Sequence, residues 1–248
     1  FLGIYETSSP SYVLMTGIER CIHYVRDNKE TAFAQLRSRL DRFYQKVSGL
    51  SHLSVVRKSD FSADEAYDFD ESKIIIFTKE AMNGHTLLEL LLKKYELQLE
   101  MAAGNYVLAL ASVMDTDEGF DRLADALLEI DSQLEKYKSD FEEFYDILKK
   151  EGIVHQFYLP VKMDTDIYQK LPAVMEMYDA YDADHQAVYA FKASGKVSGA
   201  FINIYPPGIP LVVPGEIMND KLIDDVIKAV NSALEVEGLY FDPDAHMW

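Results

Sequence analysis

YPPGIPLVVPGE, which spans residues 205–216, is the most constrained stretch of this 248-residue chain. It places four prolines and two glycines around a short apolar run. Each proline fixes its own φ and removes a backbone donor, and the residue before a proline is pushed out of the helical region. The stretch therefore predicts an extended segment that turns at Gly208, a strand over residues 209–213 and a second turn at residues 214–215. A rigid element of this kind can position side chains for a binding site or an interface.

The composition excludes several classes of protein. Asp and Glu outnumber Lys and Arg by 42 to 24, which gives a formal charge of −18. Nucleic acids and anionic membrane surfaces both attract proteins through cationic side chains. We therefore expect neither a nucleic-acid partner nor a membrane partner, and no run approaches the roughly 20 apolar residues of a membrane span. With 48% hydrophobic residues, the chain can build one large or two modest domains.

The cysteine and histidine content gives no sign of a metal site. Cys21 is the single cysteine, which rules out an internal disulfide and fits a cytoplasmic protein. Its place on an apolar helix face favours a buried, inert thiol over a nucleophile. The six histidines lack metal-ligand spacing, and the acidic residues 115–118 are better explained by helix capping than by a cation site. The chain begins with Phe1 rather than Met, which favours a fragment or a processed product.

Hydrophobic periodicity predicts an α+β protein. Two amphipathic helices come first, one starting at Ser9 and Pro10 and another ending at Gly49. A β-α-β-β-α series follows, which is typical of an antiparallel sheet with helices on one face. Its expected elements are strands at residues 73–78, 97–101 and 106–113, and helices after Asn83 and at residues 116–137. The acidic stretch 140–180 reads as linking or covering structure, and a helix at 184–193, a strand at 197–204 and a helix at 220–234 flank the proline-rich stretch.

Four ordered stretches resemble one enzyme family. YPPGIPLVVPGE and the preceding GKVSGAFI (residues 195–202) are similar to the C-terminal domain of bacterial Orn/Lys/Arg decarboxylases. ETSSPSYVLM (residues 6–15), DESKIII (70–76) and YELQLEMAAGNYVLAL (95–110) resemble three further family segments in the same order. The resemblance implies a pyridoxal 5′-phosphate (PLP) enzyme of the aspartate-aminotransferase fold type. It divides the chain into the end of a large domain (residues 1–50), a small β-α-β-β-α domain (51–140), and a linker with the C-terminal decarboxylase domain (141–248).

The sequence also departs from the family pattern. Glu6 stands where the family has Gln or Thr, and Ala103 and Gly104 replace a more polar turn. In the family, the lysine that holds PLP as a Schiff base follows a Ser-x-His sequence, and no lysine of this chain does. The resemblance therefore places the cofactor lysine and the other catalytic groups outside this chain. We expect no catalytic residue here and no activity from the chain alone.

The resemblance assigns binding roles to four residues. Thr7 and Ser8 would hold the cofactor phosphate in the neighbouring subunit's site, or they would only begin the helix. Glu100, on the strand at residues 97–101, would face the distal amino or guanidino group of the substrate, or it would be an ordinary solvent-facing glutamate. Tyr205 would lie at the pocket mouth, or it would be a packing tyrosine.

Two functions remain open from the sequence. The first is the C-terminal portion of a PLP-dependent decarboxylase that converts arginine, lysine or ornithine into CO₂ and a polyamine-type amine. It would act with the N-terminal part of the same enzyme, as a homodimer or larger oligomer. The second is a stand-alone, non-catalytic binding or regulatory module derived from such an enzyme, and an aminotransferase-like enzyme is a weaker third. In either case we expect the apolar helix face with Ile18, Ile22 and Val25 to pair with another copy or with nearby helices.

Overall fold

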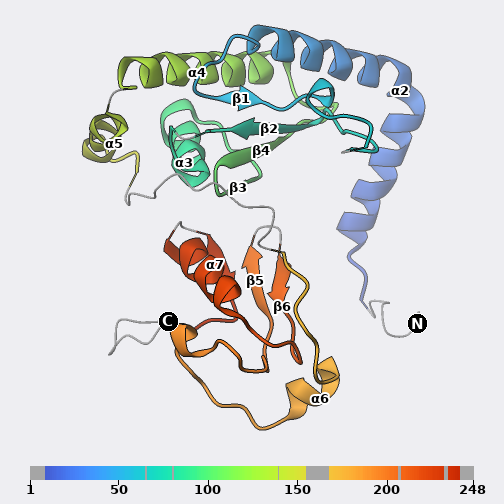
Figure 1. Ribbon diagram of the computed structural model, residues 1–248. Helices are drawn as coiled ribbons and strands as arrows, with labels where there is room; N and C mark the ends of the chain where they lie inside the picture. Colours follow the sequence, from blue (N-terminus) through green and yellow to red (C-terminus); the bar gives the residue numbers. More distant parts are fainter. Residues whose placement is uncertain are drawn as a thin grey trace.

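The computed structural model describes residues 9–64, 66–79, 81–138, 140–154, 168–205, 208–231 and 234–240. Figure 1 shows two lobes, each with a small sheet and its own helices. We call residues 9–154 the N-terminal lobe and residues 168–240 the C-terminal lobe. Sheets and helices occur in both lobes, so the protein is α+β, as the sequence predicts. Among the described helices, none is long and apolar enough to cross a membrane.

One long helix, α2 (Tyr12–Lys46), replaces the two helices that the sequence predicted. The residues between the expected pair, 26–32, contain neither proline nor glycine, so nothing interrupts the helix. The predicted start at Ser9 is also wrong, because Ser11 caps α2 by accepting a hydrogen bond from the backbone N–H of Leu14 at 3.4 Å. The N-terminal half of α2 extends away from the N-terminal lobe (Figure 1).

The sheet of the N-terminal lobe has four antiparallel strands in the order β1-β2-β4-β3. They are β1 (Ser54–Val55), β2 (Lys73–Phe77), β3 (Met101–Ala103) and β4 (Tyr106–Leu110), with a 3-10 turn, η1 (Lys58–Asp60), after β1. The side chains alternate, so that Ile74 and Ile76 of β2 and Val107 of β4 are buried on one face. The strand expected over residues 97–101 is shorter than predicted and begins only at Met101.

Four helices contribute to the core on that face. They are α2, α3 (Gly84–Tyr95), α4 (Asp117–Lys136) and α5 (Phe141–Lys150). Phe43 of α2, Leu87 of α3 and Ile130 of α4 belong to one buried cluster with the sheet. Phe144 of α5 joins the same cluster, although it lies beyond the domain boundary expected at residue 140. The division at residues 50 and 140 therefore stays a prediction.

The segment 115–118 forms the capped start of α4, as the sequence predicts: Thr116 is the N-cap, and Asp117 and Glu118 lie in the first turn. The hydroxyl of Thr116 accepts the N–H of Gly119 at 3.2 Å, and Asp115 accepts the N–H of Ser112 at 2.6 Å. The Arg42 guanidinium of α2 pairs with Asp117 and lowers the pKa of that carboxyl group. Among the described residues no group of His, Cys, Asp and Glu could hold a metal ion.

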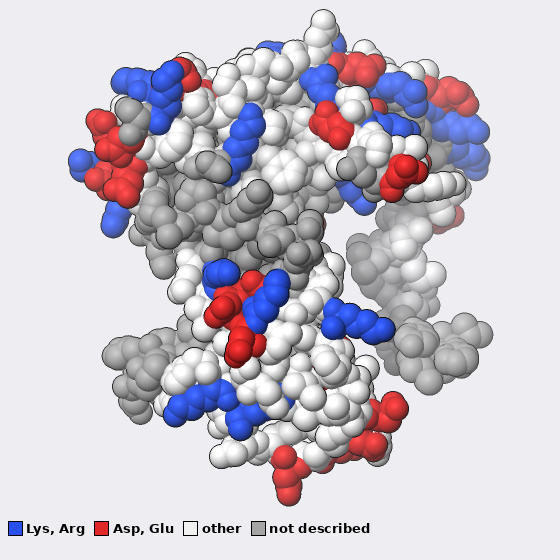
Figure 2. All heavy atoms as spheres, in the orientation of Figure 1, with Lys and Arg blue, Asp and Glu red and all other residues white. Residues whose placement is uncertain are grey.

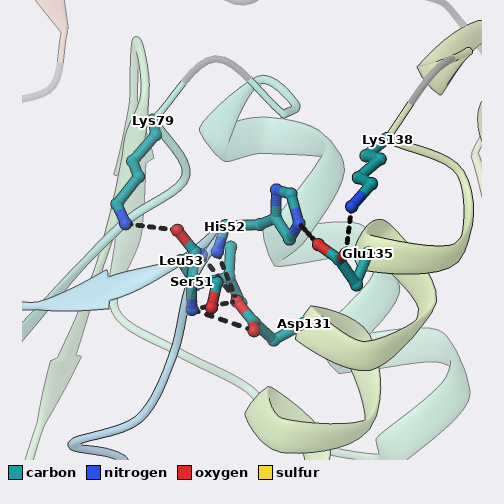
Figure 3. Close-up of polar contacts among 7 residues, drawn as sticks. All are labelled: Ser51, His52, Leu53, Lys79, Asp131, Glu135 and Lys138. Carbon is teal, nitrogen blue, oxygen red and sulfur yellow. Dashed lines mark hydrogen bonds and ion pairs between the residues drawn. The ribbon is translucent and has the colours of Figure 1, made fainter.

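A buried carboxylate ties α4 to the loop that leads into β1. Asp131, which is only 9% exposed, accepts hydrogen bonds from the backbone N–H groups of Ser51, His52 and Leu53 (Figure 3). One turn further along α4, Glu135 bonds to the His52 ring at 2.7 Å and to Lys138. These hydrogen bonds, first from Lys138 and then from His52, lower the pKa of Glu135. These contacts satisfy the backbone N–H groups of the loop before β1 and hold that loop against α4, so we assign the cluster a structural role.

The C-terminal lobe contains a three-stranded antiparallel sheet in the order β6-β5-β7. Its strands are β5 (Ile202–Tyr205), β6 (Ile209–Val212) and β7 (Glu235–Glu237), and its helical elements are α6 (Met177–Asp182), η3 (Ala190–Lys192) and α7 (Asp220–Asn231). Ile204 and Leu222 are fully buried in its core, which also includes Ala103 of β3. The two lobes therefore touch through the β3–β4 hairpin.

Two predictions for this lobe were wrong. The helix expected at residues 184–193 is only the short turn η3, whereas α6 begins inside the stretch 140–180, which was expected to be linking structure, and ends at Asp182. The strand expected at residues 197–204 forms only at its end, because Ser198 instead pairs with the turn at Gly215 and Glu216. At Ser198, tertiary hydrogen bonds overrode the local strand propensity.

Candidate functional site

The proline-rich stretch contains β6 and contributes Leu211 and Val212 to the core of the C-terminal lobe. Gly208 turns with φ +81°, and the chain then forms the edge strand β6, as predicted. Pro210 is tolerated there because an edge strand needs only half of its backbone hydrogen bonds. Pro206 and Pro207 lie outside the described residues.

The second turn of the stretch is held from three sides. Gly215, with φ +94°, donates its N–H to Ser198 at 2.8 Å and accepts the N–H of Val174 at 2.9 Å. A Cβ at Gly215 would come within 2.3 Å of the Met175 carbonyl oxygen, so only glycine fits. The Glu216 carboxylate accepts the N–H of Val213 at 2.9 Å and so caps the turn.

Tyr205 ends β5 beside the Gly208 turn. Its side chain is 51% exposed, so the ring offers a free surface rather than a buried packing contact. A Cβ added at Gly208 would lie 3.5 Å from the Tyr205 ring, in ordinary van der Waals contact.

Glu100 lies just before β3, not within a strand as the sequence suggested. Its backbone N–H donates to Leu108 at 2.9 Å, which extends the ladder by one bond, and its side chain is exposed. Among the described residues, no hydrogen bond or ion pair engages the Glu100 carboxylate or joins it to Tyr205. The substrate role of each residue stays a prediction.

Thr7 and Ser8 lie outside the described residues, but the helix that follows them is described. The N–H groups of Tyr12 and Val13 have no acceptor among the described residues, and the first turn of α2 carries no acidic side chain. By contrast, α4 and α5 carry acidic residues in their first turns. A helix start without its own carboxylates can accept an external anion.

An uncovered apolar stripe runs along the N-terminal half of α2. Leu14, Ile18 and Ile22 recur at helical spacing and are between 60% and 70% exposed. Towards the C-terminal end, the same face continues into Leu36 and Leu40, which are buried in the N-terminal lobe. Cys21 lies on the uncovered half and is exposed, so the prediction of a buried thiol was wrong. Among the described residues, no other element covers this stripe.

One further feature could not be predicted from the sequence: a pocket of about 440 Å³ at the C-terminal end of α2. Tyr44 is its buried lining residue, and the hydroxyl donates to the Glu71 carbonyl at 3.2 Å. Burial, followed by the nearby Glu71 carboxylate, raises the pKa of Tyr44 to about 12. Its lining residues come from segments 41–48, 57–59 and 71, which are too far apart in sequence to form a motif.

The described surface shows no basic region suited to nucleic acid on the face drawn in Figure 2. There, Lys and Arg are interspersed with Asp and Glu over the N-terminal lobe. At the bottom of the same view, where Figure 1 places α6, acidic side chains gather. This distribution agrees with the formal charge of −18.

Two small antiparallel sheets with helices, joined through the β3–β4 hairpin, define the class of fold, and solved structures share it. The chain superimposes on the Escherichia coli constitutive lysine decarboxylase with a TM-score of 0.70 and 16% identity, over 98% of this chain and 44% of that chain. Lysine decarboxylase A from Pseudomonas aeruginosa gives a TM-score of 0.66 and 17% identity, over 98% of this chain and 43% of that chain. The likeness establishes the fold.

Sequence comparison finds similarity to the same group of enzymes. Residues 162–236 match the family model "Orn/Lys/Arg decarboxylase, C-terminal domain". The arginine decarboxylases of Bacillus subtilis and Halalkalibacterium halodurans are 23% and 24% identical over 240 and 239 residues, which is 96% of this chain and 45% of each relative. The chain is thus related to the C-terminal portion of the Orn/Lys/Arg decarboxylases, and it spans less than half the length of these relatives.

Proposed function

We propose that this chain is the C-terminal portion of a cytoplasmic, PLP-dependent decarboxylase of a basic amino acid. The observation that carries the proposal is that two comparisons agree. In sequence, the chain matches an arginine decarboxylase over 96% of its length, and in structure it matches a lysine decarboxylase over 98%. When bound to the complete enzyme, PLP stabilises the negative charge left at the substrate's α-carbon as CO₂ departs. The chain's own residues would bind, orient and close the site rather than react.

Three features support specific roles within that proposal. The start of α2, without a carboxylate in its first turn, fits the phosphate that Thr7 and Ser8 would also hold. The exposed, unpaired carboxylate of Glu100 would bind the distal cation of a basic substrate through charge-assisted hydrogen bonds. Tyr205, held at the end of β5 with an open ring, would form part of the rim of the pocket.

The α2 stripe supports a partner for this chain. A contiguous apolar face with residues at least 60% exposed is costly in water, and here it continues an established core face. Because relatives have more than half of their length beyond the matched region, we propose that the corresponding upstream portion of the enzyme covers the stripe. The complete enzyme would then assemble as a homodimer or larger oligomer.

The proposal is tested on the complete natural gene product that contains these residues. Its intact mass and the reading frame upstream of Phe1 show whether a Ser-x-His-Lys segment precedes this chain. Bound cofactor, seen as pyridoxal absorbance, and release of CO₂ from arginine, lysine or ornithine are the expected results. A product that starts near Phe1 and binds no cofactor would favour the stand-alone module instead.

A further inference from the structure

The pocket at the C-terminal end of α2 has the size of a small-molecule site. Its volume of about 440 Å³ falls within the range of ligand pockets, roughly 300–1,000 Å³. It is built from three segments that are fixed to one another: α2, the η1 turn and the loop before β2. The hydroxyl of Tyr44 bonds to the main chain of Glu71, and the guanidinium of Arg57 bonds to the main chain of Tyr44. These bonds hold the pocket walls in place.

Arg57 offers the pocket an oriented donor group. Its Nη2 donates to the Tyr44 carbonyl oxygen, and its Cζ lies 5.6 Å from the centre of the Tyr44 ring. Its Nε and Nη1 have no acceptor among the described residues. A guanidinium that is already fixed by one bond and one ring contact can bind a carboxylate with little further loss of side-chain freedom.

Two carboxylates of the pocket have no cationic partner among the described residues. Asp41 and Glu71 are exposed, and neither side chain makes a hydrogen bond or an ion pair with a described residue. The other cation of the lining, Lys58, is already paired with Asp68 at 3.3 Å. The pocket therefore presents one available guanidinium and two available carboxylates.

This charge pattern is the complement of a basic α-amino acid, which carries one carboxylate and two cationic groups at neutral pH. We propose that the pocket binds free arginine, lysine or ornithine, with its carboxylate on Arg57 and its two cationic groups on Asp41 and Glu71. A diamine would leave Arg57 unmatched, and an uncharged side chain would leave one carboxylate unmatched. The choice of amino acids rests on the proposed function, whereas the charge pattern does not.

Isothermal titration of the 248-residue chain with arginine, lysine and ornithine tests the proposal. We expect saturable binding of at least one of them, and weaker binding of norleucine and of cadaverine. Glu71→Gln and Asp41→Asn should each weaken binding about tenfold, because each removes one charge-assisted contact. Glu19→Gln, which removes one exposed carboxylate from α2 outside the pocket, is the matched control and should bind like the wild type.

Circular dichroism shows whether the two exposed pocket variants keep their fold. Absence of saturable binding of all three amino acids would overturn the proposal, as would equal binding by wild type, Glu71→Gln and Asp41→Asn. Binding of norleucine as tight as that of lysine would also overturn it. Because the titration needs neither cofactor nor turnover, its failure would leave the proposed decarboxylase function standing.

Discussion

The carboxylate of Asp131 accepts the backbone N–H of Leu53 at 2.8 Å, across 78 positions of sequence. The same carboxylate accepts the N–H groups of Ser51 and His52, so one side chain satisfies three consecutive donors ahead of β1. Leu53 itself is fully buried. Asp131 therefore determines how the end of α2 returns to the sheet, and with it the position of Arg57 at the pocket.

Replacement of Asp131 with Ala should destabilise the protein by about 3 kcal/mol, because buried backbone donors lose a charged acceptor. The free energy of unfolding from urea denaturation measures the effect. Glu135→Gln is the matched control one turn along α4, where the carboxylate is 54% exposed. Its ion pairs face solvent and should contribute less than about 1 kcal/mol. Equal losses in both variants would contradict a special role for Asp131.

Gly84→Ala should be severely destabilising, since an added Cβ would lie 2.3 Å from the Tyr106 carbonyl oxygen of β4. We expect a loss of about 3 kcal/mol from this overpacking, measured by thermal unfolding. Gly119→Ala, also in the first turns of a helix, has its nearest contact at 3.7 Å and should be neutral or slightly stabilising. A harmless Gly84→Ala would mean that α3 does not pack so closely on the hairpin.

Alkaline pH should weaken the fold through Tyr44. Its pKa is raised from the ordinary 10.0 to about 12, first by burial and then by Glu71. Between these two values the folded state keeps a proton that the unfolded state releases, so the free energy of unfolding falls as pH rises. Tyr44→Phe should remove part of that fall, measured by urea denaturation from pH 9 to about 12. An unchanged pH dependence in Tyr44→Phe would contradict the assignment.

The α2 stripe should control association rather than stability. Ile18→Ser and Ile22→Ser together should leave the thermal unfolding of this chain nearly unchanged, because both side chains are at least 60% exposed. In the complete gene product, the same double substitution should reduce oligomer formation and cofactor retention, as measured by light scattering and absorbance. Glu19→Gln and Arg20→Gln on the same helix provide a polar control. A double stripe variant that assembles normally would show that the stripe is not an interface.

The sequence predicted the elements whose pattern is local and strong. The β-branched strand before Thr78 and the capped helix start at Thr116 both occur where periodicity and capping chemistry place them. The sequence-based prediction was wrong where tertiary hydrogen bonds compete with local strand pairing. At Ser198, for example, the backbone bonds to the turn at Gly215 and Glu216.

The candidate sites divide in the same way. Glu100 and Tyr205 were found through family motifs and are exposed as a binding role requires, although no bond joins them. The pocket of Arg57 and Glu71 could not be found from sequence, because its residues converge only when α2 packs against the sheet. Cys21 was misplaced because an apolar helix face was assumed to find its partner within this chain.

The most direct test of the decarboxylase proposal is CO₂ release by the complete gene product, supplied with PLP and with arginine, lysine or ornithine. We predict turnover of at least one of the three substrates. Glu100→Gln should raise KM by about tenfold with a smaller effect on kcat, while Glu96→Gln, a nearby exposed control, should leave both unchanged. A product that binds PLP yet releases no CO₂ from any of the three amino acids would contradict the account.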